Sequence, residues 1–316
     1  MKDTCYVGFD TSNYTTSIAV CDEAGQVILN RKKLLSVDMG ERGLRQSDAL
    51  FSHVRNLPEL LEDLKETIKD YRVAGVGCST RPRNVEGSYM PCFLAGKNAA
   101  NAFAAGLRLP VEEFSHQEGH LMAALYSSGA SEKLLAFRFA AFHVSGGTTE
   151  VLLSDPTQEG FSIARIGGTA DLNAGQAIDR IGVLMGLSFP AGKEMEPLAD
   201  TYQGVLPPIK VSVKEGICHL SGLENLASDL WKSTQDQALV SRFVFAYVAK
   251  TLAKLTEFVD DCYPGIPILY AGGVMSNRFL QETLGQRKDT YFAEPAFSSD
   301  NAAGIALLAR RKLLNA

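Results

Sequence analysis

The chain has 316 residues, a mass of 34.2 kDa and a formal net charge of −5. Its composition, 46% hydrophobic and 21% charged, is ordinary for a globular protein and excludes disordered, collagenous and fibrous chains. At about 150 residues per domain, this length suggests two domains. The excess of acidic residues excludes a basic footprint for nucleic acid over the whole surface. Local basic runs at 31–33 and 310–312 are more typical of solvated faces and helix ends.

The opening residues lead directly into a strand-like run, without an apolar segment and a small-residue cleavage site. Apolar runs stay shorter than the ~18 residues that a membrane-spanning helix needs. We therefore expect a cytoplasmic protein that does not contact membranes. The six cysteines include no C-x-x-C pair, so we expect reduced thiols, with Cys5, Cys21 and Cys78 acting as small core residues.

In the first half of the chain, strands and helices are expected to alternate. Apolar runs predict strands at 6–9, 16–20, 27–35 and 73–78, with a turn at 22–25. Apolar residues at helical spacing predict a helix over 48–71, along a stripe made of Leu50, Val54, Leu57, Leu60, Leu61, Leu64 and Ile68. An alanine-rich segment predicts a second helix over 92–107.

The second half is expected to return to strands over 134–153 and to form a helix over 230–258. A short strand at 266–270 then leads through Gly272 and Gly273 into a helix from about residue 276, and a last helix covers 300–314. Glycine lets a backbone approach a ligand closely, so this strand–Gly-Gly–helix segment is a candidate nucleotide contact. Many α/β turns have the same pattern, so the signal is weak by itself.

An internal repeat with an offset of 133 residues relates two segments, 9–16 and 142–149, which share Phe, Ser, Thr and Thr at matching positions. Both segments pass from an apolar strand through a loop rich in Ser, Thr and Gly into another strand. Small loops of this kind can surround phosphates with N–H groups and hydroxyls. The repeat predicts two similar lobes of a nucleotide-binding fold; the alternative is two unrelated hairpins.

The segment from Ser115 to His120 carries the sharpest local signal. Ser115 and Glu118 form a capping box, which predicts a helix start. His116 and His120 then stand at i and i+4 on one helix face, a spacing at which two imidazoles can bind one metal ion. The alternative is a pair of ordinary surface or core histidines. Further candidate ligands are His143, in the second hairpin, and Asp300, for which a plain helix cap is the alternative.

Segments from residue 8 to residue 306 resemble, in the same order, motifs of the TsaD/Kae/Qri family of threonylcarbamoyl transferases. These segments are Asp10-Thr11-Ser12, 115–121, 144–149, 171–180 with 186–192, 220–223, 272–277 and 300–303. The resemblance implies an α/β fold with two ribonuclease-H-like lobes around a nucleotide cleft, as in actin, hexokinase and Hsp70-like ATPases. It implies an N-terminal lobe over 1–130 completed by the helix at 300–316. The second lobe would cover 131–299, with a helical insertion near 198–255.

The resemblance also implies ligands and contacts. It implies one divalent metal held by His116, His120 and Asp300, with His143 at a position where one branch of the family has a ligating Tyr. Three imidazoles and a carboxylate suit Zn or Fe better than Mg. ATP, AMP or an acyl-adenylate would be the bound nucleotide. By position, its contacts are Asp179 and Gly192 for ribose and base, Gly272, Gly273 and Asn277 for adenine and phosphate, and Ser145, Gly146, Gly147 and Thr148 for the phosphates.

The reaction implied is transfer of a threonylcarbamoyl group from its adenylate to the N6 amine of a tRNA adenosine. Family members act on tRNA with TsaB- and TsaE-like proteins, and self-association is also consistent with the family. The first loop, with Asp10 and Ser12, is the implied catalytic loop. There the acidic pair of the family is replaced by Tyr14 and Thr15, so those two positions offer no carboxylate.

Two further departures bear on the substrate. A glutamate expected at the ribose is Gln176, and Arg81 and Arg83 stand where the family has a Gly-Pro-Gly segment. Two arginines suit a carboxylate or a phosphate, which points to an altered substrate pocket; surface charge is the alternative. The departures keep two other functions open. One is a diverged paralogue that transfers a carbamoyl or acyl group to another acceptor, and the other is a nucleotide-binding regulator without turnover.

Overall fold

The computed structural model describes residues 2–12, 14–36, 44–298 and 302–315. It divides into two compact units. The first unit comprises residues 1–129, 156–162 and 296–316, and the second comprises 130–155 and 163–295. Residues 156–162, at the tip of a hairpin, thus belong to the first unit. In the part of the chain that the structure describes, no helix is long and apolar enough to cross a membrane.

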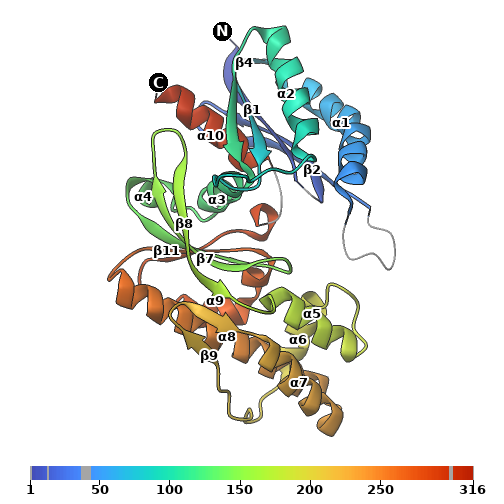
Figure 1. The fold of residues 1–316 in the computed structure, drawn as a ribbon, viewed down its shortest axis with the longest axis vertical. Helices are drawn as coiled ribbons and strands as arrows, with labels where there is room; N and C mark the ends of the chain where they lie inside the picture. Colours follow the sequence, from blue (N-terminus) through green and yellow to red (C-terminus); the bar gives the residue numbers. More distant parts are fainter. Residues whose placement is uncertain (1, 13, 37–43, 299–301, 316) are drawn as a thin grey trace. The chain divides into compact units, whose positions relative to one another are not determined.

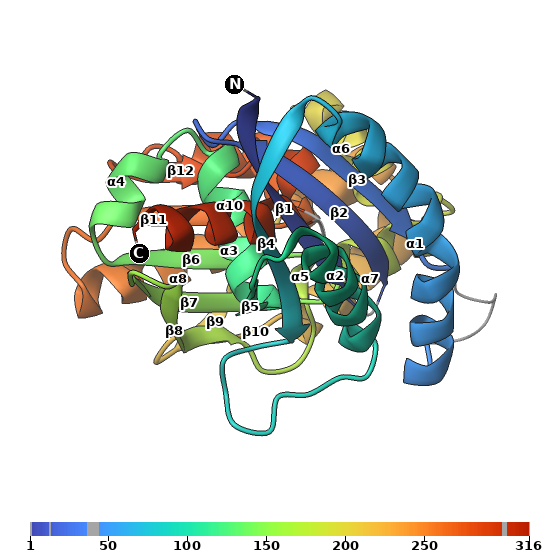
Figure 2. The same ribbon diagram turned by 90° about the horizontal axis from the view of Figure 1, so that it is seen from above.

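The first unit, of which Figure 1 labels β1, β2 and β4, is built on a five-stranded sheet with the order β3-β2-β1-β4-β5 (Figure 2). Its strands are β1 (Asp3–Thr11), β2 (Thr15–Asp22), β3 (Val27–Leu34), β4 (Tyr71–Arg81) and β5 (Val111–Ser115). Its helices are α1 (Gln46–Ile68), α2 (Phe93–Leu107), α3 (His116–Ser127) and α10 (Ala303–Leu314). β1 pairs antiparallel with β2 and parallel with β4, which pairs parallel with β5.

The alternation of side chains along β1 and β4 explains how helices cover both faces of this sheet, as Figure 2 shows. Val7 and Phe9 face α1 and α2 and form a buried cluster with leucines of α1. The alternate residues on the opposite face include Gly8 and Gly77, where α10 packs. A Cβ on Gly8 would lie 2.5 Å from the backbone nitrogen of Ala306. Glycine at these positions therefore lets α10 lie directly on the sheet.

The second unit is built on a seven-stranded sheet with the order β12-β11-β6-β7-β8-β10-β9. Its strands are β6 (Phe139–Val144), β7 (Thr149–Pro156), β8 (Phe161–Thr169), β9 (Ser212–Lys214), β10 (Ile217–His219), β11 (Ile268–Ala271) and β12 (Thr290–Phe292). Its helices are α4 (Ser131–Ala136), α5 (Ala174–Leu184), α6 (Gly192–Thr201), α7 (Ser221–Thr234), α8 (Gln237–Cys262) and α9 (Arg278–Leu284), with a 3₁₀ turn η1 (Gly273–Ser276). Another 3₁₀ turn, η2, covers Pro295–Phe297. A large apolar core includes buried residues of β6, α5, α6 and α8.

The two sheets repeat one topology. β8-β7-β6-β11-β12 has the same order as β3-β2-β1-β4-β5, and in both sheets the first strand pairs antiparallel with the second and parallel with the fourth. The segments 9–16 and 142–149 are the two equivalent hairpin bends, with Phe9 and Phe142 both fully buried. The predicted fold class, two similar α/β lobes, is therefore confirmed for each unit.

Several local predictions were wrong. Residues 134–136 belong to α4, because a short apolar run does not distinguish helix from strand. The helix expected over 230–258 is two helices, broken at Gln235 in the left-handed region (φ 52°) and restarted by Asp236, whose side chain accepts from the backbone N–H of Leu239. The region near 198–255 also contains β9 and β10.

The buried stripe of α1 differs from the predicted stripe at its N-terminal end. It runs through Ala49, His53 and Leu57, whereas Val54 is 56% exposed. A helix buries the face that fits its neighbours, and here a histidine with polar partners replaces an apolar residue on that face.

Candidate functional site

The start of α3 is a capping box, as predicted from Ser115 and Glu118. The Ser115 hydroxyl accepts a hydrogen bond from the backbone N–H of Glu118 at 3.2 Å. The Glu118 carboxylate accepts from the backbone N–H and from the hydroxyl of Ser115, both at 2.8 Å. These bonds satisfy donors that a helix start leaves unpaired, and they begin α3 at His116, directly after β5.

Three parallel strands, β1, β4 and β5, bring a buried carboxylate to this helix start. Asp10, near the end of β1, is 1% exposed, and one of its oxygens lies 2.7 Å from Nδ1 of His116. The other oxygen accepts a hydrogen bond from the Ser79 hydroxyl, near the end of β4. A carboxylate at Nδ1 favours the tautomer with its proton there, so the ring lone pair of His116 is on Nε2.

His116 and His120 lie together, with ring centroids 4.3 Å apart and ring planes at 72°. Two imidazoles, one of them oriented by a carboxylate, form a donor set that suits Zn or Fe. Of the other two predicted ligands, His143 lies on β6 in the second unit and Asp300 lies outside the described residues. Among residues 2–12, 14–36, 44–298 and 302–315, no group of three or more candidate ligands gathers at one point. The structure therefore places two of the four predicted ligands together.

The predicted catalytic residues of the first hairpin have different environments. Asp10 lies against His116, as described above. Ser12 and Thr15 are 4% and 3% exposed, and the Ser12 hydroxyl donates to the carbonyl of Thr15 at 3.5 Å. Tyr14 is 43% exposed at the tip. Of these four residues, Tyr14 is exposed, whereas Asp10, Ser12 and Thr15 are buried.

His53, which sequence reasoning missed, fixes this loop from α1. It is fully buried, its Nε2 lies 2.7 Å from the carbonyl of Ser12, and its Nδ1 lies 2.8 Å from the hydroxyl of Thr16. Since a carbonyl only accepts, Nε2 carries the proton and Nδ1 accepts from Thr16. Burial lowers the pKa of His53 from its ordinary 6.5, although the bond to Ser12 and the charge of Asp10 oppose this. A histidine on an apolar helix stripe was the available signal.

In the second unit, the loop from Ser145 to Thr148 is a tight turn with open glycines. The backbone N–H of Ser145 donates to the carbonyl of Thr148 at 2.7 Å, and the Ser145 hydroxyl accepts from the backbone N–H of Thr148 at 3.1 Å. A Cβ built on Gly146 or Gly147 would meet no described atom within 4 Å. The turn closes through its own atoms, and its glycines leave room for a ligand.

The Gly272–Gly273 turn lies beside this loop, because β11 and β6 are neighbouring parallel strands. Gly272 has φ 102°, and a Cβ there would lie 2.2 Å from the carbonyl oxygen of Val144. Gly175, at the start of α5, also approaches the loop closely: its Cβ would lie 2.6 Å from the backbone nitrogen of Gly146. Three backbone segments thus meet at the carboxyl ends of β6 and β11, where ligands bind in many α/β sheets.

The remaining predicted nucleotide residues are tied to one another around α6. Asp179 on α5 accepts from the backbone N–H of Ala191 at 2.8 Å, which places it next to Gly192, the first residue of α6. Burial raises the pKa of Asp179, although this hydrogen bond opposes the shift. Glu196 of α6 accepts from the backbone N–H of Arg278 at 2.7 Å. Asn277, the residue before Arg278, caps α9: its side-chain oxygen accepts from the backbone N–H of Leu280 at 3.0 Å.

Gln176 and the two arginines are placed as follows. The side-chain oxygen of Gln176 accepts from the backbone N–H of Asn173 at 3.3 Å, so it takes part in the cap of α5. Arg81 ends β4 and donates to the amide oxygen of Asn84 at 2.8 Å, while the backbone N–H of Arg83 donates to the Ser88 hydroxyl at 3.1 Å. Both arginine residues are half-buried.

Solved structures with this fold are similar to the chain at low sequence identity. Full-length HypF, crystallised in a phosphate- and nucleotide-bound form, has a TM-score of 0.59 and 13% identity over 99% of this chain; the match covers 56% of HypF, so this chain spans about half its length. Component A of (R)-2-hydroxyglutaryl-CoA dehydratase from Acidaminococcus fermentans has a TM-score of 0.55 and 14% identity, over 98% of this chain and 99% of that one. These similarities establish the fold of the actin, hexokinase and Hsp70-like ATPases.

Sequence relatives are more specific. A protein of Neorickettsia sennetsu described as tRNA N6-adenosine threonylcarbamoyltransferase is 29% identical, over 99% of this chain and 95% of its own length. A protein of Streptococcus pneumoniae with the same description is 30% identical, over 90% of this chain and 84% of its own length. The profile of the TsaD family, described as tRNA N6-adenosine threonylcarbamoyltransferase, matches residues 47–307. By this match the chain belongs to the TsaD family.

Proposed function

We propose that this protein transfers a threonylcarbamoyl group from threonylcarbamoyl-AMP to the N6 amine of a tRNA adenosine. The observation that carries the proposal is the arrangement of Asp10, His116 and His120 in a chain of the TsaD family. In the reaction, a C–N bond forms between N6 and the carbamoyl carbon, the bond from that carbon to the phosphate oxygen breaks, and AMP leaves. The amine gives up one proton.

The residues of the first unit have distinct roles in this proposal. His116 and His120 hold a divalent metal through imidazole nitrogens, with Asp300 and His143 as the further proposed ligands. When bound, such a metal supplies Lewis-acid polarisation of a carbonyl or phosphoryl oxygen. Asp10 accepts the Nδ1 proton of His116, so Nε2 is the nitrogen that would hold the metal. Tyr14 and Thr15 offer no carboxylate, so the loop itself supplies no base of ordinary carboxylate pKa.

The second unit binds the AMP part of the substrate in this proposal. The glycines of the 145–148 loop and Gly273 leave room for phosphate oxygens near backbone N–H groups. In this proposal, Asp179 and Gly192 contact the ribose and the base, and Asn277 contacts the adenine. HypF, a neighbour with the same fold, was crystallised in a nucleotide-bound form, which is consistent with the nucleotide proposed here.

A diverged paralogue with another acceptor is the second candidate. It is favoured by Tyr14, exposed where the family has an acid, and by Arg81, which has no carboxylate within 4 Å among the described residues. A regulator without turnover would keep the nucleotide and lose the transfer. The partners proposed for the transferase are tRNA and TsaB- and TsaE-like proteins.

The test is transfer from threonylcarbamoyl-AMP to unmodified tRNA, with the partner proteins present and a TsaD of known activity as the positive control. Modified adenosine is measured by mass spectrometry of nucleosides, and AMP release is measured in parallel. Product that disappears in His116→Ala but persists in the matched His219→Ala supports the transferase. AMP release without modified tRNA indicates another acceptor. Neither product, with the positive control active, contradicts both enzyme proposals.

A further inference from the structure

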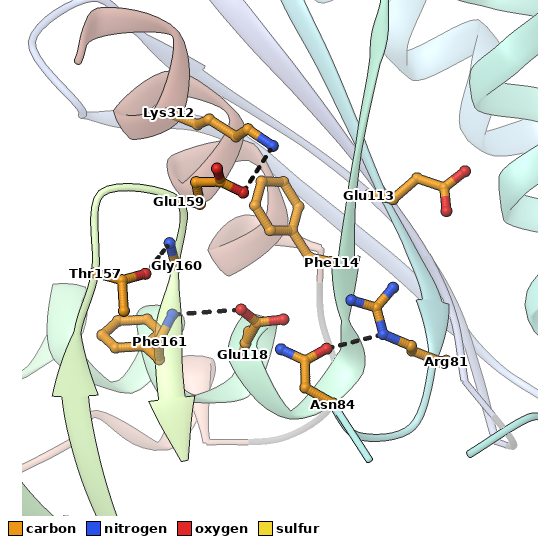
Figure 3. Close-up of a pocket in the computed structure, with 10 residues that line it drawn as sticks. All are labelled: Arg81, Asn84, Glu113, Phe114, Glu118, Thr157, Glu159, Gly160, Phe161 and Lys312. Atoms are coloured by element: carbon orange, nitrogen blue, oxygen red, sulfur yellow. Dashed lines mark hydrogen bonds and ion pairs between the residues drawn. The ribbon is translucent and has the colours of Figure 1, made fainter. Parts of the chain in front are cut away.

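A pocket of about 220 Å³ lies within the first unit beside the start of α3. Figure 3 shows Arg81 and Asn84 on one side of it, Thr157 and Phe161 from the tip of the β7–β8 hairpin on the other, and Glu118 between them. The proposed transferase does not use this pocket, although one of its lining residues, Arg81, also supports the second candidate function. Its volume is below the ~300–1,000 Å³ of drug-sized sites, so it suits a ligand of about amino-acid size.

The buried carboxylate of the pocket is already satisfied by the fold. One oxygen of Glu118 accepts from Ser115, as described for the capping box, and the other accepts from the backbone N–H of Phe161 at 3.3 Å. Glu118 therefore holds the hairpin tip against α3. Its lone pairs serve this contact, which leaves the charged groups at the edge of the pocket to recognise a ligand.

The charged groups at the edge of the pocket form two close ion pairs, Glu113 with Lys97 and Lys312 with Glu112, and one longer pair, Lys312 with Glu159. Glu113 lies 2.7 Å from the amine of Lys97. The Lys312 amine lies 2.8 Å from the Glu112 carboxylate but 3.6 Å from that of Glu159, so its pair with Glu159 is the weaker one. The Glu159 side chain is 80% exposed. Of these carboxylates, Glu159 is thus the most weakly held and the most accessible to a ligand cation.

Arg81 is the cation of the pocket that the fold leaves without a carboxylate. Its Nε donates to the amide oxygen of Asn84 at 2.8 Å and its Nη1 donates to the Thr80 hydroxyl at 3.0 Å. No carboxylate of the described chain lies within 4 Å of its guanidinium, in contrast to Arg138 and Arg180. These bonds fix the guanidinium while Nη2 remains available, and Figure 3 shows the amide nitrogen of Asn84 on the side of Glu118. A fixed, unpaired guanidinium is suited to bind a carboxylate or a phosphate.

The charge of the lining residues decides between these two anions. Arg81 and Lys312 are positive, whereas Glu113, Glu118 and Glu159 are negative, so the pocket carries an excess of negative charge. A phosphate dianion would meet repulsion from the carboxylates, while a ligand with one carboxylate and one ammonium group would match both signs. We propose that this pocket binds a small zwitterion, an α-amino acid or a close analogue, with its carboxylate on Arg81 and its ammonium group on Glu159.

The test is isothermal titration of the full chain with individual L-amino acids, and with acetate, ethylammonium and inorganic phosphate as single-charge and dianion probes. We expect at least one amino acid to bind about tenfold or more tightly than each of the three probes. Arg81→Gln should weaken that binding about tenfold or more, and Glu159→Gln should weaken binding of the amino acid but not of acetate. The matched control is Arg55→Gln, which removes an exposed arginine on α1 and should bind as the unmodified chain does.

Three outcomes would overturn the proposal. One is the absence of saturation by any amino acid at about 10 mM. Another is phosphate binding more tightly than every amino acid, which would make the pocket a plain anion site. The third is unchanged binding in Arg81→Gln. Should Arg81→Gln fail to fold, Arg81→Lys is the second variant, because it keeps the charge and loses the two parallel N–H donors of the guanidinium. It must also bind the amino acid more weakly. Because the readout is binding without tRNA or adenylate, the result is independent of the transferase test.

Discussion

The two hairpin bends of the repeat occupy equivalent positions in their sheets, yet they are built in opposite ways. The bend between β1 and β2 turns its polar groups inward: Ser12 and Thr15 are buried and His53 bonds to both sides of the loop. The bend between β6 and β7 closes through Ser145 and leaves Gly146 and Gly147 open. One scaffold thus fixes a carboxylate beside a histidine pair in the first unit and exposes a glycine loop in the second. The sheet topology therefore determines where each bend lies, and the residues of the bend determine which groups it presents.

The largest effect is expected on the first-unit side, at the histidine pair. His116→Ala should lower the affinity for zinc more than about 100-fold, because it removes a proposed ligand. Asp10→Asn should lower that affinity about 10- to 100-fold, because it weakens the contact at Nδ1 of His116. Zinc content after dialysis against a metal buffer measures both, with His219→Ala as the control histidine. Far-UV circular dichroism should show all variants folded. A His116→Ala/Asp300→Ala double variant that retained one zinc per chain would refute this assignment.

The contrast between closed and open bends is tested by stability. His53→Ala should lower the free energy of unfolding by about 3 kcal/mol, because it removes the acceptor of the buried Thr16 hydroxyl and a donor to the Ser12 carbonyl, and opens a cavity. The Thr16 oxygen still accepts from the Asn56 amide. Ser145→Ala should lower it by about 1 kcal/mol or less, because water can replace its hydroxyl at an exposed turn. Urea unfolding followed by circular dichroism compares the two. Equal losses would mean that the two bends are equally closed.

Two glycines sharpen the comparison within the second unit. Gly175→Ala forces a Cβ to 2.6 Å from the backbone nitrogen of Gly146. We expect a net loss of about 2 kcal/mol, since overpacking costs up to about 3 and the helix propensity of alanine returns about 1. Gly146→Ala should stay within about 0.5 kcal/mol, because its Cβ points into open space. Thermal unfolding measures both, and a destabilised Gly146→Ala would show that the loop is packed.

The smallest effect is a pH dependence that belongs to the closed bend alone. The pKa of His53 is lower in the folded protein than the ordinary 6.5, so the unfolded chain binds the proton more readily. Stability from this group is therefore present above about pH 6.5 and declines as the pH falls below it, by at most about 1.4 kcal/mol per pH unit. His53→Gln should remove this part of the slope between pH 7.5 and pH 5.5, whereas His219→Gln should keep it. An unchanged slope in His53→Gln would contradict the inferred neutral state.

Local signals predicted the parts of the site that are local in sequence. The capping box at Ser115 and Glu118, the histidine pair of α3 and the repeat of the two bends each need only a few neighbouring residues. The contacts of Asp10 with Ser79 and His116 join residues 69 and 106 positions apart, so spacing carries no information about them. The break at Gln235 was missed because the apolar stripe continues across it and only the backbone reveals the left-handed turn. His53 was missed because its buried partners are on another element.

The glycine-lined face of the first sheet has a consequence for the order of events during synthesis. Gly8 and Gly77 are made early, yet the helix that covers them, α10, is made only after the whole of the second unit. At ribosomal speeds this interval is on the order of ten seconds. Until then, Gly8 and Gly77 lack the helix that covers them in the folded first unit. The first unit therefore depends on a helix distant in sequence, and a chain that ends before residue 303 lacks the cover of Gly8 and Gly77.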